Sequence, residues 1–150
     1  MKSYIVFSDI HGDLRSFYPL KERIKDHDGA FFAGDGISTI EGITEKELYA
    51  VRGNCDYSGE IERVTEIDGV RILLTHGHAY KVKSDLLLLL YRARELNCRV
   101  AIFGHTHIPY IRQEDGVLLI NPGACSGWGE KTHAILYLEN GKASAIINNI

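Results

Sequence analysis

The chain has 150 residues and a net charge of -3, and its 45% hydrophobic and 25% charged residues are typical of a globular protein. This length is the common size of one domain, so we expect residues 1–150 to form a single domain with its own hydrophobic core. The mild acidity and the lack of a basic stripe argue against a general nucleic-acid binder, and no apolar run reaches the ~20 residues needed to span a bilayer.

Strand-like apolar runs recur along the whole chain and are typical of buried β-strands. They cover Tyr4–Ser8, Gly29–Ala33, Leu48–Val51, Val70–Thr75, Arg99–Phe103, Val117–Ile120, His133–Glu139 and Lys142–Ile147. The turn at residues 139–142 contains Asn-Gly, the signature of a β-hairpin, so the last two runs are predicted to pair.

A helical pattern over Leu14–Asp26 lies between the first two strands. Its apolar side chains recur every three or four residues and therefore share one face of a helix. Pro19 interrupts this pattern, because proline has no backbone N–H and clashes with the preceding turn. The helix therefore either kinks at Pro19 or begins near Tyr18.

The clearest helix is predicted over Ser84–Asn97. Ser84 can cap its start, Asp85 suits its first turn, and Asn97 suits its end. The apolar run inside it covers more than one face, so we expect this helix to be well buried.

The order of these elements predicts the fold class. Strands and helices alternate in the first part of the chain, whereas strands dominate the later part. This order favours an α/β protein with two mixed sheets and helices outside them, a four-layer α/β/β/α sandwich. The parallel strands of such a fold end in loops at one edge, where open α/β folds bind their ligands.

Ligand-type side chains next to glycine follow five of the predicted strands. The motifs are Asp9-Ile10-His11-Gly12, Gly34-Asp35-Gly36, Gly53-Asn54-Cys55-Asp56, Thr75-His76-Gly77-His78 and Gly104-His105-Thr106-His107. One such motif alone is more often a turn than a site, but five of them in order indicate a metal site. The remaining histidines, His27 and His133, are interpreted as surface or structural residues.

The donor types suggest which ions bind. Imidazole, carboxylate and amide ligands without thiolate pairs suit divalent Mn²⁺, Fe²⁺, Zn²⁺ or Ni²⁺. Asp9 and His11 can face one ion, because residues two apart on an extended segment point the same way. Asp35 could bridge two ions ~3.5–4 Å apart, and such a pair clamps a phosphoryl group and lowers the pKa of a bridging water.

The three cysteines, Cys55, Cys98 and Cys125, are widely spaced and form no CxxC pair. A thiolate zinc site is therefore not expected. Free thiols are typical of a reducing compartment, so we expect a cytoplasmic protein.

Taken together, Asp-x-His, Gly-Asp, Gly-Asn-x-Asp, Thr-His-Gly-His and Gly-His-Thr-His resemble the motifs of the calcineurin-like metallophosphoesterases. The chain length and Asn121-Pro122-Gly123 are similar to those of the small YfcE-like phosphodiesterase group. The resemblance implies two metal sites that share Asp35. One site would use Asp9, His11, Asp35 and His107, and the other would be completed by Asn54, His76 and His105. Two divalent ions, most commonly Mn²⁺, are implied, with Ni²⁺, Fe²⁺, Zn²⁺ or Mg²⁺ as alternatives.

The same resemblance implies hydrolysis of a small phosphate ester by a metal-bridging hydroxide, with Asn54, His76, His78 and Cys55 as catalytic candidates. Many family members carry a histidine at the position of Cys55, where it protonates the leaving group. A neutral thiol is a poorer acid, which favours a phosphodiester with an acidic leaving group. His78 is either an alternative acid or a support for His76. A second departure is Ala124, where serine is usual.

Two other functions remain open at this stage. The chain could be a non-catalytic protein-binding scaffold, as is the retromer subunit that resembles these enzymes, but all seven ligand positions are kept. It could instead be a phosphomonoesterase, against which the missing histidine argues. No aromatic or basic cluster marks a substrate pocket, and a homo-oligomer is possible.

Overall fold

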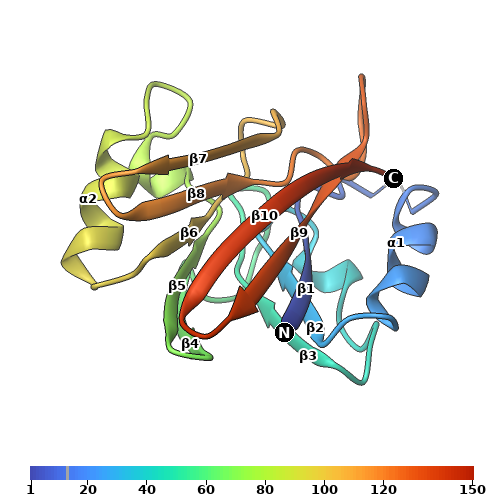
Figure 1. Ribbon diagram of the computed structural model, residues 1–150. Coiled ribbons are helices and arrows are strands. Elements are labelled where there is room, and N and C mark those ends of the chain that lie inside the picture. Colours follow the sequence, from blue (N-terminus) through green and yellow to red (C-terminus); the bar gives the residue numbers. More distant parts are fainter. Residues whose placement is uncertain (13) are drawn as a thin grey trace.

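Two five-stranded mixed sheets pack against each other in the computed structural model, which describes residues 1–12 and 14–150 (Figure 1). The first sheet has the strand order β10-β9-β1-β2-β3. Its strands are β1 (Lys2–Phe7), β2 (Gly29–Phe32), β3 (Glu47–Ala50), β9 (Thr132–Glu139) and β10 (Lys142–Asn149). β1, β2 and β3 run parallel, whereas β9 and β10 form the predicted hairpin and β9 lies antiparallel to β1.

The second sheet has the order β4-β5-β6-β8-β7. Its strands are β4 (Glu62–Ile67), β5 (Val70–Thr75), β6 (Val100–Ile102), β7 (Tyr110–Glu114) and β8 (Val117–Asn121). β5, β6 and β8 are parallel, and β4 and β7 are antiparallel edge strands. The sequence analysis did not predict β4 or β7, because these two edge strands mix apolar with polar or charged side chains and carry no continuous apolar run.

The helices α1 (Phe17–Ile24) and α2 (Leu87–Glu95) lie at opposite sides of the molecule (Figure 1). Three hydrophobic cores separate the layers: one between the sheets, one under α1 and one under α2. Residues of β1 alternate between two of them, since Val6 faces the other sheet whereas Ile5 and Phe7 face α1. The predicted four-layer α/β/β/α sandwich is confirmed.

The first helix is shorter than the predicted Leu14–Asp26. It begins at Phe17, within one residue of the alternative start near Tyr18. Pro19 is then the third helical residue. The first four N–H groups of a helix have no partner within the helix, so proline loses nothing there and no kink is required.

The second helix corrects two expectations. Ser84 does not cap it, because the helix begins at Leu87, whose N–H is bound by the Asp85 carboxylate at 2.9 Å. Nor is it buried on all sides, since Leu87, Leu88 and Tyr91 are 49%, 46% and 56% exposed. The helix is followed by Asn97 in the left-handed conformation, φ 58°, as an asparagine after a helix end commonly is.

The parallel strands of both sheets end at the same edge of the sandwich. The loops that follow β1, β2, β3, β5 and β6 carry the five motifs, so the fold brings them together. Two short 3₁₀ helices lie at two of these motifs: η1 (Ile37–Thr39) follows Gly36, and η2 (His78–Tyr80) begins at His78 itself. Within the described part of the chain, no helix has the length and apolar character to cross a membrane.

Candidate metal centre

Asp9 lies at the centre of the converging loops and is completely buried. Its Oδ2 accepts hydrogen bonds from the Ser8 hydroxyl at 2.5 Å and from the backbone N–H of His105 at 3.3 Å. Its Oδ1 is buried without a hydrogen bond, and the Nε2 atoms of His107 and His11 lie 3.2 and 3.4 Å from it. One carboxylate oxygen is thus anchored, while the other faces two imidazole nitrogens.

His76 organises a second group of ligand atoms beside the first. Its Nδ1–H donates to the carbonyl oxygen of Ala33 at 2.7 Å, so the neutral ring carries no proton on Nε2. That Nε2 lies 2.9 Å from Asn54 Oδ1 and 3.2 Å from His105 Nδ1. The bond to Ala33 also joins the loop after β5 of the second sheet to the loop after β2 of the first.

Asp35 stands between the two groups. Its Oδ2 lies 3.3 Å from Nε2 of His76 and 3.8 Å from Nε2 of His11. Its Oδ1 accepts the backbone N–H of Cys55 at 2.9 Å. An oxygen placed between two sets of imidazoles has the position of a bridging ligand.

Several of these acceptor atoms face one another without a donor between them, an arrangement that bound cations would satisfy. The buried Asp9 Oδ1 has no hydrogen bond, and an unsatisfied buried carboxylate oxygen costs several kcal/mol, about 1–3 or more. Two oxygen acceptors, Asn54 Oδ1 and Asp35 Oδ2, face Nε2 of His76 at 2.9 and 3.3 Å. Divalent cations at these points would satisfy every one of these acceptors. All seven predicted ligand residues therefore meet, although their role as ligands stays a prediction.

The backbone is strained at four of the predicted ligands. Asp9, Asp35, His105 and His107 adopt φ values of 60°, 65°, 69° and 65°, in the left-handed region that L-residues rarely occupy. Each such residue costs on the order of 1–3 kcal/mol and persists only where its surroundings hold it. This strain aims the side chains at a common point and is typical of functional sites.

Two supporting residues were not among the predicted site residues. The Asp56 carboxylate accepts the backbone N–H groups of Asp35, Gly36, Ile37 and Gly53 at 2.9, 2.9, 3.2 and 2.8 Å. It therefore binds the loops after β2 and β3 together. The sequence signal was its place in the Gly-Asn-x-Asp motif. The other is Ser8, which directly precedes Asp9 and anchors its carboxylate.

The Asn121-Pro122-Gly123 segment supports the loop after β6. The Asn121 amide donates to the carbonyl oxygen of Gly104 at 3.1 Å and to the Thr106 hydroxyl at 2.9 Å, and its Oδ1 accepts the N–H of Gly123 at 2.9 Å. Because Thr106 lies between His105 and His107, these bonds hold both imidazoles in place.

The protonation of the site is set by burial and by neighbouring charges. Burial would raise the pKa of Asp9, but the close contact with His107 and the charge of His76 hold that pKa below its ordinary value. The contact with Asp9 raises the pKa of His107. Burial, aided by the charges of His76 and Lys83, lowers the pKa of His105 to about 4, so this ring is neutral at neutral pH, as a metal ligand must be.

The remaining two catalytic candidates lie beside this centre. Burial, with the charges of His76 and Arg52, lowers the pKa of His78, whose Nδ1 is buried without a hydrogen bond. Its ring lies 5.5 Å from that of His76 between centroids. The Cys55 side chain is exposed, but partial loss of hydration at its sulfur and the nearby Asp35 carboxylate raise the pKa of its thiol, which is therefore neutral at neutral pH.

Of the two histidines assigned surface or structural roles, His27 is bonded to the Ser3 hydroxyl at 2.8 Å. His133 is 1% exposed at the start of β9, with Nδ1 unbonded. Burial lowers its pKa to about 4.

Comparison with known proteins places this chain in a family. Residues 1–141 match the model of the calcineurin-like phosphoesterase superfamily domain. The probable metallophosphoesterase YsnB of Bacillus subtilis is 33% identical over 146 residues, which cover 93% of this chain and 86% of that protein.

Solved structures share the fold over almost the whole chain. A predicted phosphoesterase from Streptococcus pneumoniae has a TM-score of 0.86 and 27% identity, covering 99% of this chain and 89% of its own. A structure described as a novel archaeal phosphodiesterase has a TM-score of 0.79 and 25% identity, and the match covers 97% of this chain and 99% of that chain. Vps29 from Entamoeba histolytica has a TM-score of 0.79 at 20% identity, covering 99% of each chain, and at that identity the likeness shows the fold alone.

Proposed function

The chain belongs to the calcineurin-like phosphoesterase superfamily, and from this membership we propose that it is a phosphodiesterase that uses two divalent cations. Its relatives are named as a metallophosphoesterase and a phosphodiesterase, and these names support a metal-dependent phosphoesterase activity. The observation that carries the two-metal proposal is the position of Asp35 Oδ2, between Nε2 of His76 at 3.3 Å and Nε2 of His11 at 3.8 Å.

The ligand atoms divide into two sets around Asp35. Asp9, His11 and His107 would hold one cation, and Asn54, His76 and His105 would hold the other. When bound, two such cations lower the pKa of a water between them and neutralise the charge of a phosphoryl group. Oxygen and imidazole donors suit Mn²⁺, Fe²⁺, Ni²⁺, Zn²⁺ or Mg²⁺, and we propose Mn²⁺ as the first ion to test.

The protein's own contribution is to hold these donors in place. The Ser8 hydroxyl and the N–H of His105 occupy Asp9 Oδ2, which leaves Oδ1 for a cation. The Ala33 carbonyl sets the tautomer of His76. Asn54 turns Oδ1 toward His76, and its Nδ2 donates to the Cys55 sulfur at 3.6 Å, so the second N–H of this amide would be the donor to a phosphoryl oxygen.

The choice of a diester over a monoester rests on the lack of an acid at the centre. The Cys55 thiol has a raised pKa, and the His78 ring has a lowered one, so neither is suited to protonate a poor leaving group. A diester with an acidic alcohol needs little protonation. The likeness to a protein described as an archaeal phosphodiesterase supports the same preference.

The experiment is hydrolysis of a chromogenic bis-aryl phosphodiester by the metal-free protein reloaded with each divalent ion in turn. We expect turnover with Mn²⁺ and loss of it in Asp35→Asn and His76→Ala. Rates on the matching aryl phosphomonoester decide between the two ester classes. Failure to turn over either ester with any ion, together with capture of one stoichiometric protein partner, would instead establish the scaffold alternative.

A further inference from the structure

An apolar groove of about 460 Å³ opens beside the metal centre. Its walls come from the segment before α2, through Val82 and Leu86, and from the loop and strand after β6, through Phe103, Ile108 and Tyr110. The volume is within the range of pockets that hold small ligands, roughly 300–1,000 Å³. Five apolar side chains and no carboxylate therefore line a space of substrate size.

The groove is continuous with the site through its own residues. Thr106 lines it, and Thr106 stands between His105 and His107, the two predicted ligands of that loop. Ile108 follows His107 directly and is 64% exposed at the rim. On the other wall, a Cβ added to Gly77 would lie 2.8 Å from Val82, so the turn that carries His76 and His78 rests on this wall.

Lys83 brings a positive charge to the junction between the groove and the centre. It lines the groove together with Thr106, the residue between the predicted ligands His105 and His107. A phosphate ester held by the cations would have its anionic oxygens near this ammonium, whereas its alcohol would lie along the apolar walls. Lys83 is thus complementary to the anionic phosphoryl group of the ester, and the apolar walls are complementary to its alcohol.

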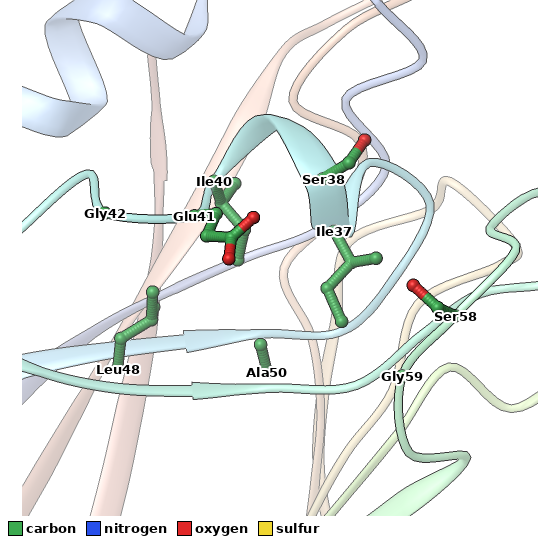
Figure 2. Close-up of a pocket in the computed structure, with 9 residues that line it drawn as sticks. All are labelled: Ile37, Ser38, Ile40, Glu41, Gly42, Leu48, Ala50, Ser58 and Gly59. Carbon is green, nitrogen blue, oxygen red and sulfur yellow. The ribbon is translucent and has the colours of Figure 1, made fainter.

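A second hollow near the site lacks this match. It has a volume of about 370 Å³ and lies between η1 and β3, and Figure 2 shows Ile37 and Ile40 opposite Leu48 and Ala50. The one charged residue that lines it is Glu41, whose carboxylate repels a phosphate ester. Charge therefore favours the groove beside Lys83.

We propose that this groove binds the apolar, ring-bearing alcohol of the diester, with Lys83 contacting the phosphoryl oxygens. The inference rests on the proposed phosphodiesterase function and names its substrate class. Flat apolar rings fit such walls, because burying apolar surface is favourable and needs no directed polar partner. Sugars, which need many hydrogen-bond partners, are disfavoured by the same lining.

The test measures binding without turnover, by calorimetry on the Mn²⁺-loaded protein. The two probes are phenylphosphonate and methylphosphonate, which carry the same phosphoryl group. Their C–P bond is not an ester, so a phosphoesterase does not cleave it. The titrations are run at a pH where both compounds are dianions. We expect the phenyl compound to bind about tenfold more tightly, because its ring buries more apolar area. Ile108→Ser should reduce this advantage to about threefold or less, and Lys83→Met should weaken both compounds by a similar factor of about five.

Leu88→Ser is the matched control, because Leu88 is 46% exposed on α2 and does not line the groove. It should leave both affinities unchanged. Equal binding of the two phosphonates to the wild-type protein, or an unchanged ratio in Ile108→Ser, would overturn the groove assignment. If the same preparation still hydrolyses aryl diesters, the proposed function stands while the groove falls. If it neither hydrolyses diesters nor binds a phosphonate, both fall.

Discussion

The Asp56 carboxylate accepts the backbone N–H of Asp35 at 2.9 Å and so ties the loop after β3 to the turn after β2. The same carboxylate also binds the N–H groups of Gly36 and Gly53 at 2.9 and 2.8 Å. A side chain that contacts no predicted ligand atom thereby positions the proposed bridging carboxylate. Residues of this kind orient the ligands of a metal centre, so their loss weakens metal binding although they do not touch the ion.

Asp56→Asn should lower Mn²⁺ affinity about 10–100-fold, because an amide has one acceptor oxygen where the carboxylate has two. The measurement is a calorimetric titration of the metal-free variant. Glu60→Gln is the control, since Glu60 lies on the same loop and is 71% exposed. Wild-type affinity in a folded Asp56→Asn protein would contradict the positioning role.

Asp35→Asn should reduce the metal content from two ions to at most one and lower kcat/KM by about a hundredfold or more, because the proposed bridge is lost. Elemental analysis and aryl-diester kinetics measure the two effects. Asp68→Asn is closely matched, since Asp68 also has a positive φ, 54° against 65°, in the turn between β4 and β5. A variant at Asp35 that kept two ions would exclude the bridging role.

Gly104→Ala should displace Asp9 and abolish metal binding. A Cβ at this position would collide with the Ser8 hydroxyl and lie 2.8 Å from Asp9 Oδ2. Gly116→Ala is the control, because nothing lies within 4 Å of its added Cβ, although its φ of 80° strains an alanine. We expect the control to lose about 1 kcal/mol of stability in urea unfolding and to bind metal normally. Normal metal content in Gly104→Ala would count against the placement of Asp9.

Cys55→Ser should leave the rate on an aryl diester within about threefold, because the thiol is not among the proposed ligands of either cation and is a poor proton donor. Cys55→His should raise the rate on monoesters with alkyl leaving groups by about 10–100-fold, since imidazolium is an effective general acid. Both are read from kcat/KM across leaving groups of different pKa. A large loss of aryl-diester activity in Cys55→Ser would show that the thiol takes part in the reaction.

Stability should decrease as the pH falls from 6.5 to about 4, in part because of His133, whose pKa is lowered to about 4 in the folded chain. The unfolded chain takes up a proton on this ring near the ordinary pKa, 6.5, while the folded chain does not, so acid favours unfolding. The contribution is at most about 3 kcal/mol.

The readout for this effect is urea unfolding of the metal-free protein across that pH range. His133→Gln should show a shallower decrease than the wild type, whatever its stability at neutral pH. His27→Gln is the comparison, because it removes one of the smaller causes of the lowered pKa of His133 and leaves the buried ring itself in place. Parallel pH profiles for the wild type and His133→Gln would refute the assignment.

The sequence by itself determined the fold class and predicted the donor residues of the candidate site. Alternating apolar runs and turn residues predicted eight of the strands and two helices, because burial and local backbone preference act within short stretches of chain. The five motifs determined which donor types lie at the strand ends. The hairpin at Asn140-Gly141 followed from turn chemistry alone.

Tertiary structure decided what depends on neighbours distant in the chain. The edge strands β4 and β7 are held by pairing on one side, which leaves no apolar signature, and α2 begins at Leu87 because Asp85 binds its N–H. The position of Asp35 between His11 and His76 arises from contacts between two sheets. So does the groove beside Lys83, whose walls come from segments that the sequence separates. Local backbone preference specifies the individual strands and helices. Which strand ends meet at the candidate site is decided by packing between segments that are distant in the sequence.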